Sequence, residues 1–161
     1  MDVLRLGTLL NRLTSKVGVY QEEWFIVTLI IFREATSSDV NYALVTDALG
    51  CFSYVGMQKG AQKVWLQSSG CSSYSTMAHE FLHGFGLYHE HNRPDRDDYV
   101  EIKWDNIVKK WQYAYNKCTN CETYDVPYDG KSVMHYHPWG FAIDSSKFTM
   151  ESKVCFISNF Y

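Results

Sequence analysis

One short stretch constrains this chain more than any other, because it spaces three histidines in a pattern that suits one metal ion. It runs from His79 to Glu90 and reads H-E-F-L-H-G-F-G-L-Y-H-E. His79 and His83 are four residues apart, so on a helix their side chains point the same way. Two imidazoles on one face can bind one Zn²⁺, with Zn–N bonds of about 2.0–2.1 Å. The spacing therefore predicts a helix that carries two metal ligands.

The rest of the motif predicts how a third ligand arrives. Gly86 can end the helix, because glycine adopts a left-handed turn at little cost, and His89 then reaches the ion from outside the helix. Three protein ligands leave a position for water, which is typical of a catalytic zinc site. Glu80 follows the first ligand, so its carboxylate can address that water. The alternative, ordinary buried or surface histidines, is disfavoured because Gly86 and His89 are both in place.

Composition narrows the class of protein. The chain has 161 residues, of which 46% are hydrophobic and 16% aromatic, and this fits one globular domain with a real core. A net charge of −3 gives no indication of a nucleic-acid partner. The longest apolar run, residues 24–32, is far shorter than the roughly 20 residues that span a bilayer. We expect no nucleic acid and no membrane insertion.

Local patterns predict four strands and two helices. The strands are expected at residues 24–32, 42–46, 52–55 and 61–67. The first is apolar enough to be a buried central strand, and the last alternates like a half-exposed one. Serines and threonines at 72–76 offer N-caps for a helix to about Phe85, and a second helix is expected over 104–116. Irregular structure should dominate from Cys118 onward.

Two further segments carry a family resemblance together with the histidine motif and its continuation N-R-P-D-R-D-D-Y-V at 92–100. Residues 132–136 read S-V-M-H-Y, and residues 50–56 read G-C-F-S-Y-V-G. These segments are similar to the astacin family of secreted zinc endopeptidases, which belongs to the metzincins. S-V-M-H-Y resembles the Met-turn of that family. The resemblance extends over about residues 30–150.

The resemblance implies an α+β metzincin (zincin-like) fold. A twisted mixed sheet and the zinc-binding active-site helix would form one part, and an irregular C-terminal subdomain would carry the Met-turn. The strand at 61–67 is expected at the sheet edge, where an extended peptide can add as a further strand; a hairpin strand with a solvated face is the alternative. We place an incomplete peptidase domain at residues 24–154, with residues 1–23 unassigned and 155–161 an atypical tail.

The resemblance also implies roles for the residues of the motif. His79, His83 and His89 would hold one Zn²⁺ per chain, Glu80 would act as general base on the zinc-activated water, and Tyr136 would be both a further ligand and a catalytic group. Tyr136 is expected to leave the ion and hydrogen-bond the transition state when substrate arrives. A buried tyrosine with a satisfied hydroxyl is the alternative for Tyr136.

The residues around these ligands are expected to support them. Met134 would form an apolar floor beneath the metal, while His135 and His137 are interpreted as structural or exposed. In the family, the glutamate at the position of Glu90 meets the processed N-terminus; here we expect water or another cation, because a buried unpaired carboxylate is costly. A mixed-sign cluster is interpreted as a structural salt-bridge network, formed by Arg93, Asp95, Arg96 and Asp97.

The cysteines bear on the compartment. Cys51 and Cys71 match a disulfide pair in the family, and closing that loop would stabilise the fold by roughly 3 kcal/mol. Cys118 and Cys121 form a C-x-x-C, for which we favour a small loop disulfide over a redox pair or half of a zinc site, because no second C-x-x-C exists. The family's other bridge is absent, so Cys155 is expected to be a free thiol.

These observations predict a secreted zinc endopeptidase that cleaves peptide bonds in proteins or peptides. No signal peptide or propeptide is recognisable in the first 16 residues. The alternative is a non-catalytic zinc-stabilised binding module or a degenerate protease fragment. A thiol oxidoreductase that uses Cys118 and Cys121 would need a thioredoxin-like βαβ setting, which the sequence does not show.

Overall fold

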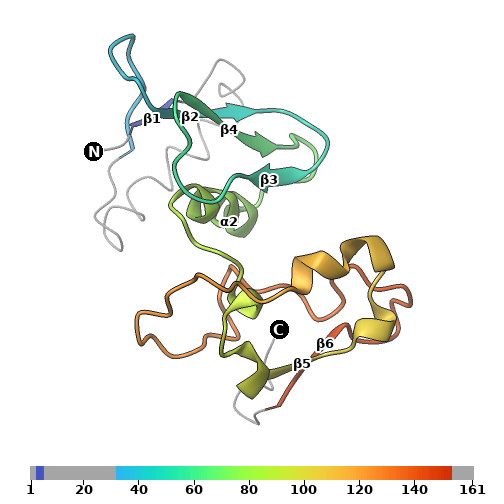
Figure 1. Cartoon of the computed structure of the whole chain (residues 1–161). Coiled ribbons are helices and arrows are strands. Elements are labelled where there is room, and N and C mark those ends of the chain that lie inside the picture. Colours follow the sequence, from blue (N-terminus) through green and yellow to red (C-terminus); the bar gives the residue numbers. More distant parts are fainter. Residues whose placement is uncertain (1–2, 6–31, 154–161) are drawn as a thin grey trace. The chain divides into compact units, whose positions relative to one another are not determined.

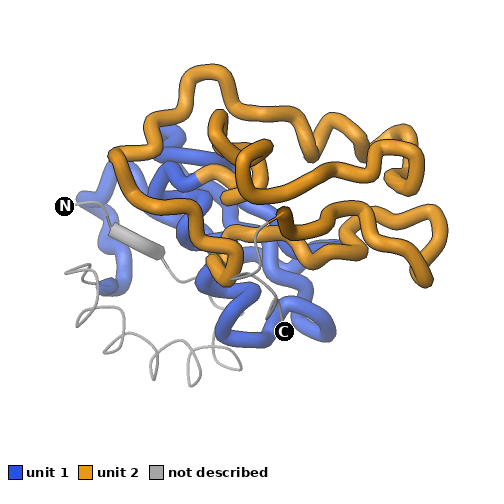
Figure 2. Tube along the Cα trace, turned by 90° about the horizontal axis from the view of Figure 1, so that it is seen from below, with its two compact units in different colours: residues 1–87 blue, residues 88–161 orange. Residues whose placement is uncertain are grey.

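The structure is a computed structural model that describes residues 3–5 and 32–153. The chain forms two compact units, residues 1–87 and residues 88–161, which Figure 2 shows in separate colours. Of the strand expected at 24–32, all but Phe32 lies outside the described residues, as does Cys155. Among the described residues, no helix is long and apolar enough to cross a bilayer.

A four-stranded sheet forms the framework of the first unit (Figure 1). Its order is β1 (Val3–Arg5), β2 (Tyr42–Thr46), β4 (Ala61–Leu66) and β3 (Cys51–Ser53). The first three strands are parallel, and β3 runs antiparallel to β4. The predictions for β2 and β4 are confirmed to within one residue. β3 begins one residue earlier and ends two residues earlier than expected.

The expectation that the strand at 61–67 forms the sheet edge is wrong. β4 lies between β2 and β3, so its backbone groups pair with a strand on each side, and β3 is the outer strand of the described sheet at this end. The reason is local: after β3 the chain turns back through residues 54–60 and enters between the two strands. A strand that alternates buried and exposed residues can occupy either position, because alternation reports the faces of a sheet and not its edges.

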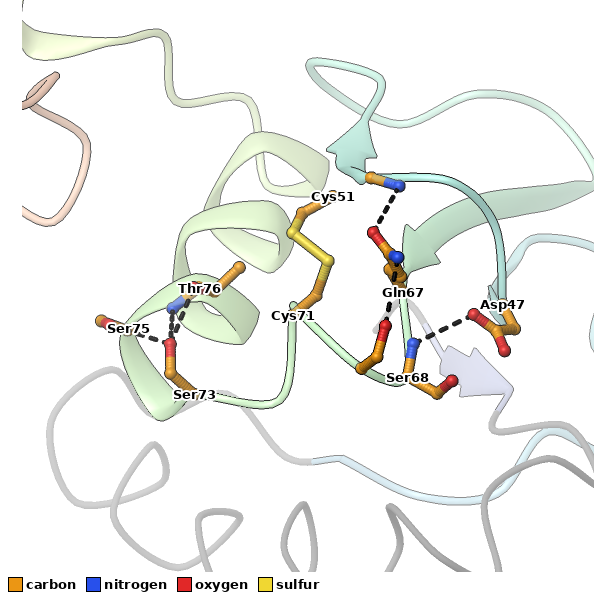
Figure 3. The surroundings of a disulfide bond; sticks show 10 residues. Asp47, Cys51, Gln67, Ser68, Cys71, Ser73, Ser75 and Thr76 are labelled. Carbon is orange, nitrogen blue, oxygen red and sulfur yellow. Dashed lines mark hydrogen bonds between the residues drawn. A yellow bond between two sulfur atoms is a disulfide. The ribbon is translucent and has the colours of Figure 1, made fainter. Parts of the chain in front are cut away.

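Helix α2 (Tyr74–Gly84) covers one face of this sheet. It begins where the sequence predicts, because the Ser73 hydroxyl accepts a hydrogen bond of 3.1 Å from the Thr76 amide (Figure 3). The expected Cys51–Cys71 disulfide is present and joins β3 to the loop before the helix. The core between helix and sheet is formed by Phe32, Ala43, Val45, Val64, Leu66, Cys71, Met77 and Phe81.

The second unit is mostly irregular, as expected, and it holds a two-stranded antiparallel sheet of β5 (Val100–Ile102) and β6 (Met150–Ser152). Its helices are short 3-10 turns at Glu90–Asn92, Arg96–Asp98, Trp104–Asn106 and Lys109–Tyr115. The expected continuous helix over 104–116 is therefore wrong. Ile107 is extended and bridges Ala142, because the backbone there pairs with a distant strand-like segment. The expected Cys118–Cys121 disulfide is present.

The core of the second unit is built around buried aromatic and branched side chains. Tyr115 and Val100 are fully buried, and Tyr115 donates a hydrogen bond of 2.6 Å from its hydroxyl to the carbonyl of Gly140. Asn106 ties this unit together, since its amide donates to three carbonyl oxygens between residues 144 and 148. The core cluster consists of Val100, Ile102, Ile107, Tyr115, Tyr128 and Met150.

Candidate metal centre and active site

The end of helix α2 is shaped by Gly86. Its φ is +101°, a conformation that costs glycine little and other residues more. The Leu87 amide donates to the Leu82 carbonyl (3.0 Å), and the Gly86 amide donates to the His83 carbonyl (2.9 Å). This pair of hydrogen bonds is the Schellman motif, which satisfies the last carbonyl groups of a helix. The turn predicted at Gly86 is therefore confirmed.

The three histidines of the motif come together. The ring nitrogens of His79, His83 and His89 that could ligate a metal all lie within 4.8 Å of one another. His79 and His83 stand one helical turn apart, with ring centroids separated by 4.7 Å and ring planes at 89°. Three imidazole donors at such a spacing are the ligand set of a zinc ion with one position left for water.

His83 is held for this role by a main-chain group. Its Nδ1 lies 2.8 Å from the Leu87 carbonyl oxygen, and a carbonyl can only accept a hydrogen bond. The proton therefore resides on Nδ1, and Nε2 carries the lone pair that a metal ion binds. Such a bond from the second ring nitrogen fixes the orientation and the tautomer of a metal-binding histidine. Burial also lowers the pKa of His83, which favours the neutral ring.

Glu80 provides the observation that tests the fit of a metal. This residue is only 5% exposed, and its Oε2 is one of two buried side-chain oxygen atoms in the described part of the chain that have no hydrogen-bond partner. Burial raises the pKa of Glu80 to about 7. A buried carboxylate oxygen without a donor is costly, and it suits a site where water and a cation are held. The residues present therefore fit a zinc ion.

The third ligand lies against Tyr136. The ring centroids of His89 and Tyr136 are 4.4 Å apart, which places the predicted fourth ligand beside the third. Met134 is 2% exposed, and its carbonyl accepts a hydrogen bond of 3.0 Å from the Glu90 amide, which attaches the Met-turn segment to the end of the motif. Ligation by Tyr136 and packing of Met134 beneath the metal stay predictions.

The residues after the motif form the ion-pair network that the sequence indicates. Glu90 does find a cation: its Oε1 accepts from Arg93 Nη1 at 3.1 Å and from the Asp129 amide at 2.9 Å. Arg93 also binds Asp95 at 2.8 Å. Arg96 pairs with Asp97, which in turn accepts from Lys117 at 2.8 Å. The network fixes the segment that follows His89, as expected for a structural role.

The two histidines of the Met-turn segment have neighbours that suit the structural interpretation. His135 Nε2 lies 2.6 Å from the Tyr128 hydroxyl, and its Nδ1 lies 2.8 Å from the Tyr136 carbonyl. Burial lowers the pKa of His135. The ring of His137 stacks on Trp139, with centroids 4.7 Å apart. Neither residue belongs to the group of histidines that converge on the metal position.

Two groups at the site were not identified from the sequence. The Leu87 carbonyl is a main-chain atom, and only the turn at Gly86 pointed toward it. His91 is completely buried, and its ring lies against both His89 and Tyr136. The only signal was a histidine two residues after the third ligand, which no part of the motif explains.

Comparison with known proteins agrees with this geometry. A family model described as Astacin, a peptidase family, matches residues 11–159. Zinc metalloproteinase nas-14 of Caenorhabditis elegans is 39% identical over 125 residues, which are 75% of this chain and 25% of that protein. Meprin A subunit alpha of Mus musculus is 36% identical over 116 residues, which are 71% of this chain and 15% of that protein.

Solved structures show the same relationship. High choriolytic enzyme 1, a hatching enzyme zinc-protease from Oryzias latipes, superimposes with a TM-score of 0.88 at 27% identity, over 95% of this chain and 76% of that chain. Myroilysin gives a TM-score of 0.58 at 26% identity. The chain spans about a quarter of the length of the nas-28 and nas-14 proteinases of Caenorhabditis elegans, 27% and 25% respectively. From its match over residues 11–159, the chain belongs to the astacin family of peptidases and has the α+β fold of that family's zinc proteases.

Proposed function

We propose that this chain is the peptidase domain of a zinc metalloendopeptidase that hydrolyses peptide bonds in proteins or peptides. The observation that carries the proposal is the buried, partnerless oxygen of Glu80 on the same helix as two converging histidines. A merely structural zinc site has no use for an unsatisfied carboxylate beside its ligands. A hydrolase needs one, because the attacking water must lose a proton.

We assign His79, His83 and His89 to hold the zinc ion, with Tyr136 as a further ligand in the resting protein. When bound, zinc supplies Lewis-acid chemistry, lowering the pKa of water toward about 7 and polarising a carbonyl group. Glu80 takes a proton from the attacking water as its oxygen bonds to the peptide carbonyl carbon. Glu80 then gives that proton to the amide nitrogen as the C–N bond breaks. Tyr136 donates a hydrogen bond to the oxyanion that forms on the carbonyl oxygen.

An extended substrate is expected to pair with the outer strand β3, Cys51–Ser53. The unpaired backbone groups of an edge strand can accept another strand, and β3 occupies that position in the described sheet. A protein or peptide is therefore the expected partner. Two disulfides in a chain of this size support secretion, since such bonds persist in oxidising compartments.

The decisive experiment combines zinc titration with digestion of a casein-type protein substrate. The zinc-loaded chain should cleave the substrate, and a chelator should stop the reaction. Glu80→Gln keeps the shape of the side chain but removes the base, so zinc affinity should persist while the rate falls about 10²–10⁴-fold. Glu101→Gln, a change at an exposed carboxylate on β5, is the matched control and should cleave at the wild-type rate.

The same experiment separates the enzyme from the binding module. Tight zinc binding without turnover in the wild-type chain would favour a non-catalytic zinc-stabilised module. Turnover that survives Glu80→Gln would show that another group is the base. Loss of zinc binding in Glu80→Gln would instead mean that Glu80 helps to hold the ion.

A further inference from the structure

His91 is a completely buried histidine in the second unit, and none of the roles assigned so far involves it. Its ring centroid lies 4.1 Å from that of Tyr136, with ring planes at 35°. On the His89 side, the centroids are 5.2 Å apart and the planes meet at 25°. His91 therefore touches the rings of one assigned zinc ligand and of the tyrosine assigned to both ligation and the oxyanion.

Two hydrogen bonds fix the orientation of the His91 ring. The Tyr136 amide donates to His91 Nδ1 at 3.4 Å, so this nitrogen carries a lone pair and no proton. The other nitrogen, Nε2, lies 3.3 Å from the Ala114 carbonyl oxygen, to which it must donate. Both contacts require the same neutral tautomer, with the proton on Nε2. The ring thus has one consistent hydrogen-bonding state, and a rotation by 180° would break both bonds.

The surroundings of His91 hold its backbone as firmly as its ring. Arg96 Nη1 donates to the His91 carbonyl and to the Tyr115 carbonyl, each at 2.8 Å. Arg96 is itself only 4% exposed. Asn92 donates to the Ala114 carbonyl at 2.9 Å, so the acceptor of His91 Nε2 is also fixed. A side chain supported in this way can transmit its position to what it touches.

We propose that His91 is a positioning residue that fixes the backbone and the ring plane of Tyr136, and thereby holds the phenol in its ligating position beside His89. The inference rests on the proposed function in one respect, namely that Tyr136 ligates the metal. His91 contacts no substrate and no metal in this scheme. A residue that merely filled the core would contribute to stability but would leave the environment of the Tyr136 phenol unchanged.

The test uses the protein loaded with Cu²⁺ in place of Zn²⁺. A phenolate bound to Cu²⁺ gives a visible charge-transfer absorption, which Tyr136→Phe should abolish. His91→Leu removes both hydrogen bonds and the flat ring, so this absorption should weaken at least twofold or shift at saturating Cu²⁺. His91→Asn has nearly the shape of His91→Leu, but its side-chain oxygen can accept the Tyr136 amide, so it should restore part of the absorption. In the zinc protein, kcat should fall at least tenfold in His91→Leu with little change in KM.

Val100→Ala is the control for stability. Val100 is fully buried in β5 of the same unit, so its truncation should lower the free energy of unfolding without changing the charge-transfer absorption. Wild-type absorption in a folded His91→Leu would overturn the positioning role and leave the proposed function intact. Absence of any Tyr136-dependent absorption in the wild type would show instead that the assigned ligand set is wrong.

A second measurement needs no variant. The ring nitrogens of His91 in ¹⁵N-labelled zinc protein should show the neutral tautomer with the proton on Nε2. A spectrum with the proton on Nδ1 would overturn the inference, because Nδ1 could not then accept the Tyr136 amide.

Discussion

The Nδ1 atom of His83 donates a hydrogen bond to the carbonyl oxygen of Leu87, 2.8 Å away. This carbonyl belongs to the turn that ends helix α2 and not to the helix itself. The orientation of a metal-binding imidazole therefore depends on the left-handed turn at Gly86. Helix termination and ligand orientation are set by one local structure.

Gly86→Ala should weaken both stability and zinc binding. A non-glycine residue at φ +101° is strained by about 1–3 kcal/mol, and relief of that strain would move the Leu87 carbonyl away from His83. We expect a lower free energy of unfolding in urea and a reduced zinc affinity in chelator competition.

Gly84→Ala is the matched control, because Gly84 lies two residues earlier, as the last residue of α2. A methyl group there would meet its nearest neighbours at 3.7 and 3.9 Å, which is ordinary contact. Alanine is the better helix former by up to about 1 kcal/mol, so this variant should keep or gain stability. Unchanged zinc affinity in Gly86→Ala would contradict the link between the turn and His83.

The two disulfides should contribute unequally to stability. Cys51 and Cys71 are 20 residues apart, whereas Cys118 and Cys121 are three apart. On the loop-entropy model the first closure is worth about 3 kcal/mol and the second about 2 kcal/mol. Replacing each pair by serine and measuring unfolding in urea should give the larger loss for the first pair, which also removes the buried sulfur of Cys71 from the core. Equal losses would mean that strain or denatured-state structure dominates.

Gly140 should not tolerate a methyl group, although its backbone conformation is not the reason. A Cβ at Gly140 would lie 2.8 Å from the Tyr115 hydroxyl oxygen and 3.2 Å from the His137 carbonyl oxygen. The hydroxyl cannot easily move, since Tyr115 is fully buried and bonds to the Gly140 carbonyl. We expect Gly140→Ala to cost about 1–3 kcal/mol of unfolding free energy.

A double-mutant cycle with Tyr115→Phe tests this explanation. Removing the hydroxyl removes the closest clash, so Gly140→Ala should cost less in the Tyr115→Phe background than in the wild type. Additive losses would show that the hydroxyl is not what excludes the methyl group. The His137 carbonyl remains in place, so some cost should persist.

Sequence patterns predicted the elements whose determinants are local. Helix α2 has its N-cap at Ser73 and its end at Gly86, both of which can be recognised from neighbouring residues. Strand β2 was predicted with its observed bounds because a short apolar run follows a turn. The convergence of His79, His83 and His89 was also predictable, since the spacing within one short segment determines it.

What the sequence did not reveal depends on contacts between distant residues. Strands β5 and β6 are three residues each and pair with one another from opposite ends of the second unit. Ile107 and Tyr115 have helical spacing, yet the backbone at Ile107 bonds to Ala142 and the helix breaks there. The contact of His91 with Tyr136 is of the same kind, because no local pattern relates the two residues.

Asp144 should make stability depend on pH in the acid range. Its carboxylate accepts hydrogen bonds from the Ser146 hydroxyl (2.6 Å) and amide (3.0 Å) and pairs with Lys147 (3.1 Å). The hydrogen bond from the Ser146 hydroxyl is the main cause that lowers the pKa of Asp144 from 3.8 to about 2. Because the pKa is lower in the folded state, the ionised form favours folding.

The stabilisation from Asp144 should be complete above about pH 4 and disappear as the pH falls through about 2. Asp144→Asn removes the charge, so the difference in urea midpoint between wild type and variant should be constant from about pH 7 to 5, narrow between about pH 4 and 2, and vanish below. Ser146→Ala removes the hydroxyl donor and should reduce this difference partway. A difference that grows as the pH falls would contradict the sign of the shift and show that Asp144 does not favour folding through its charge.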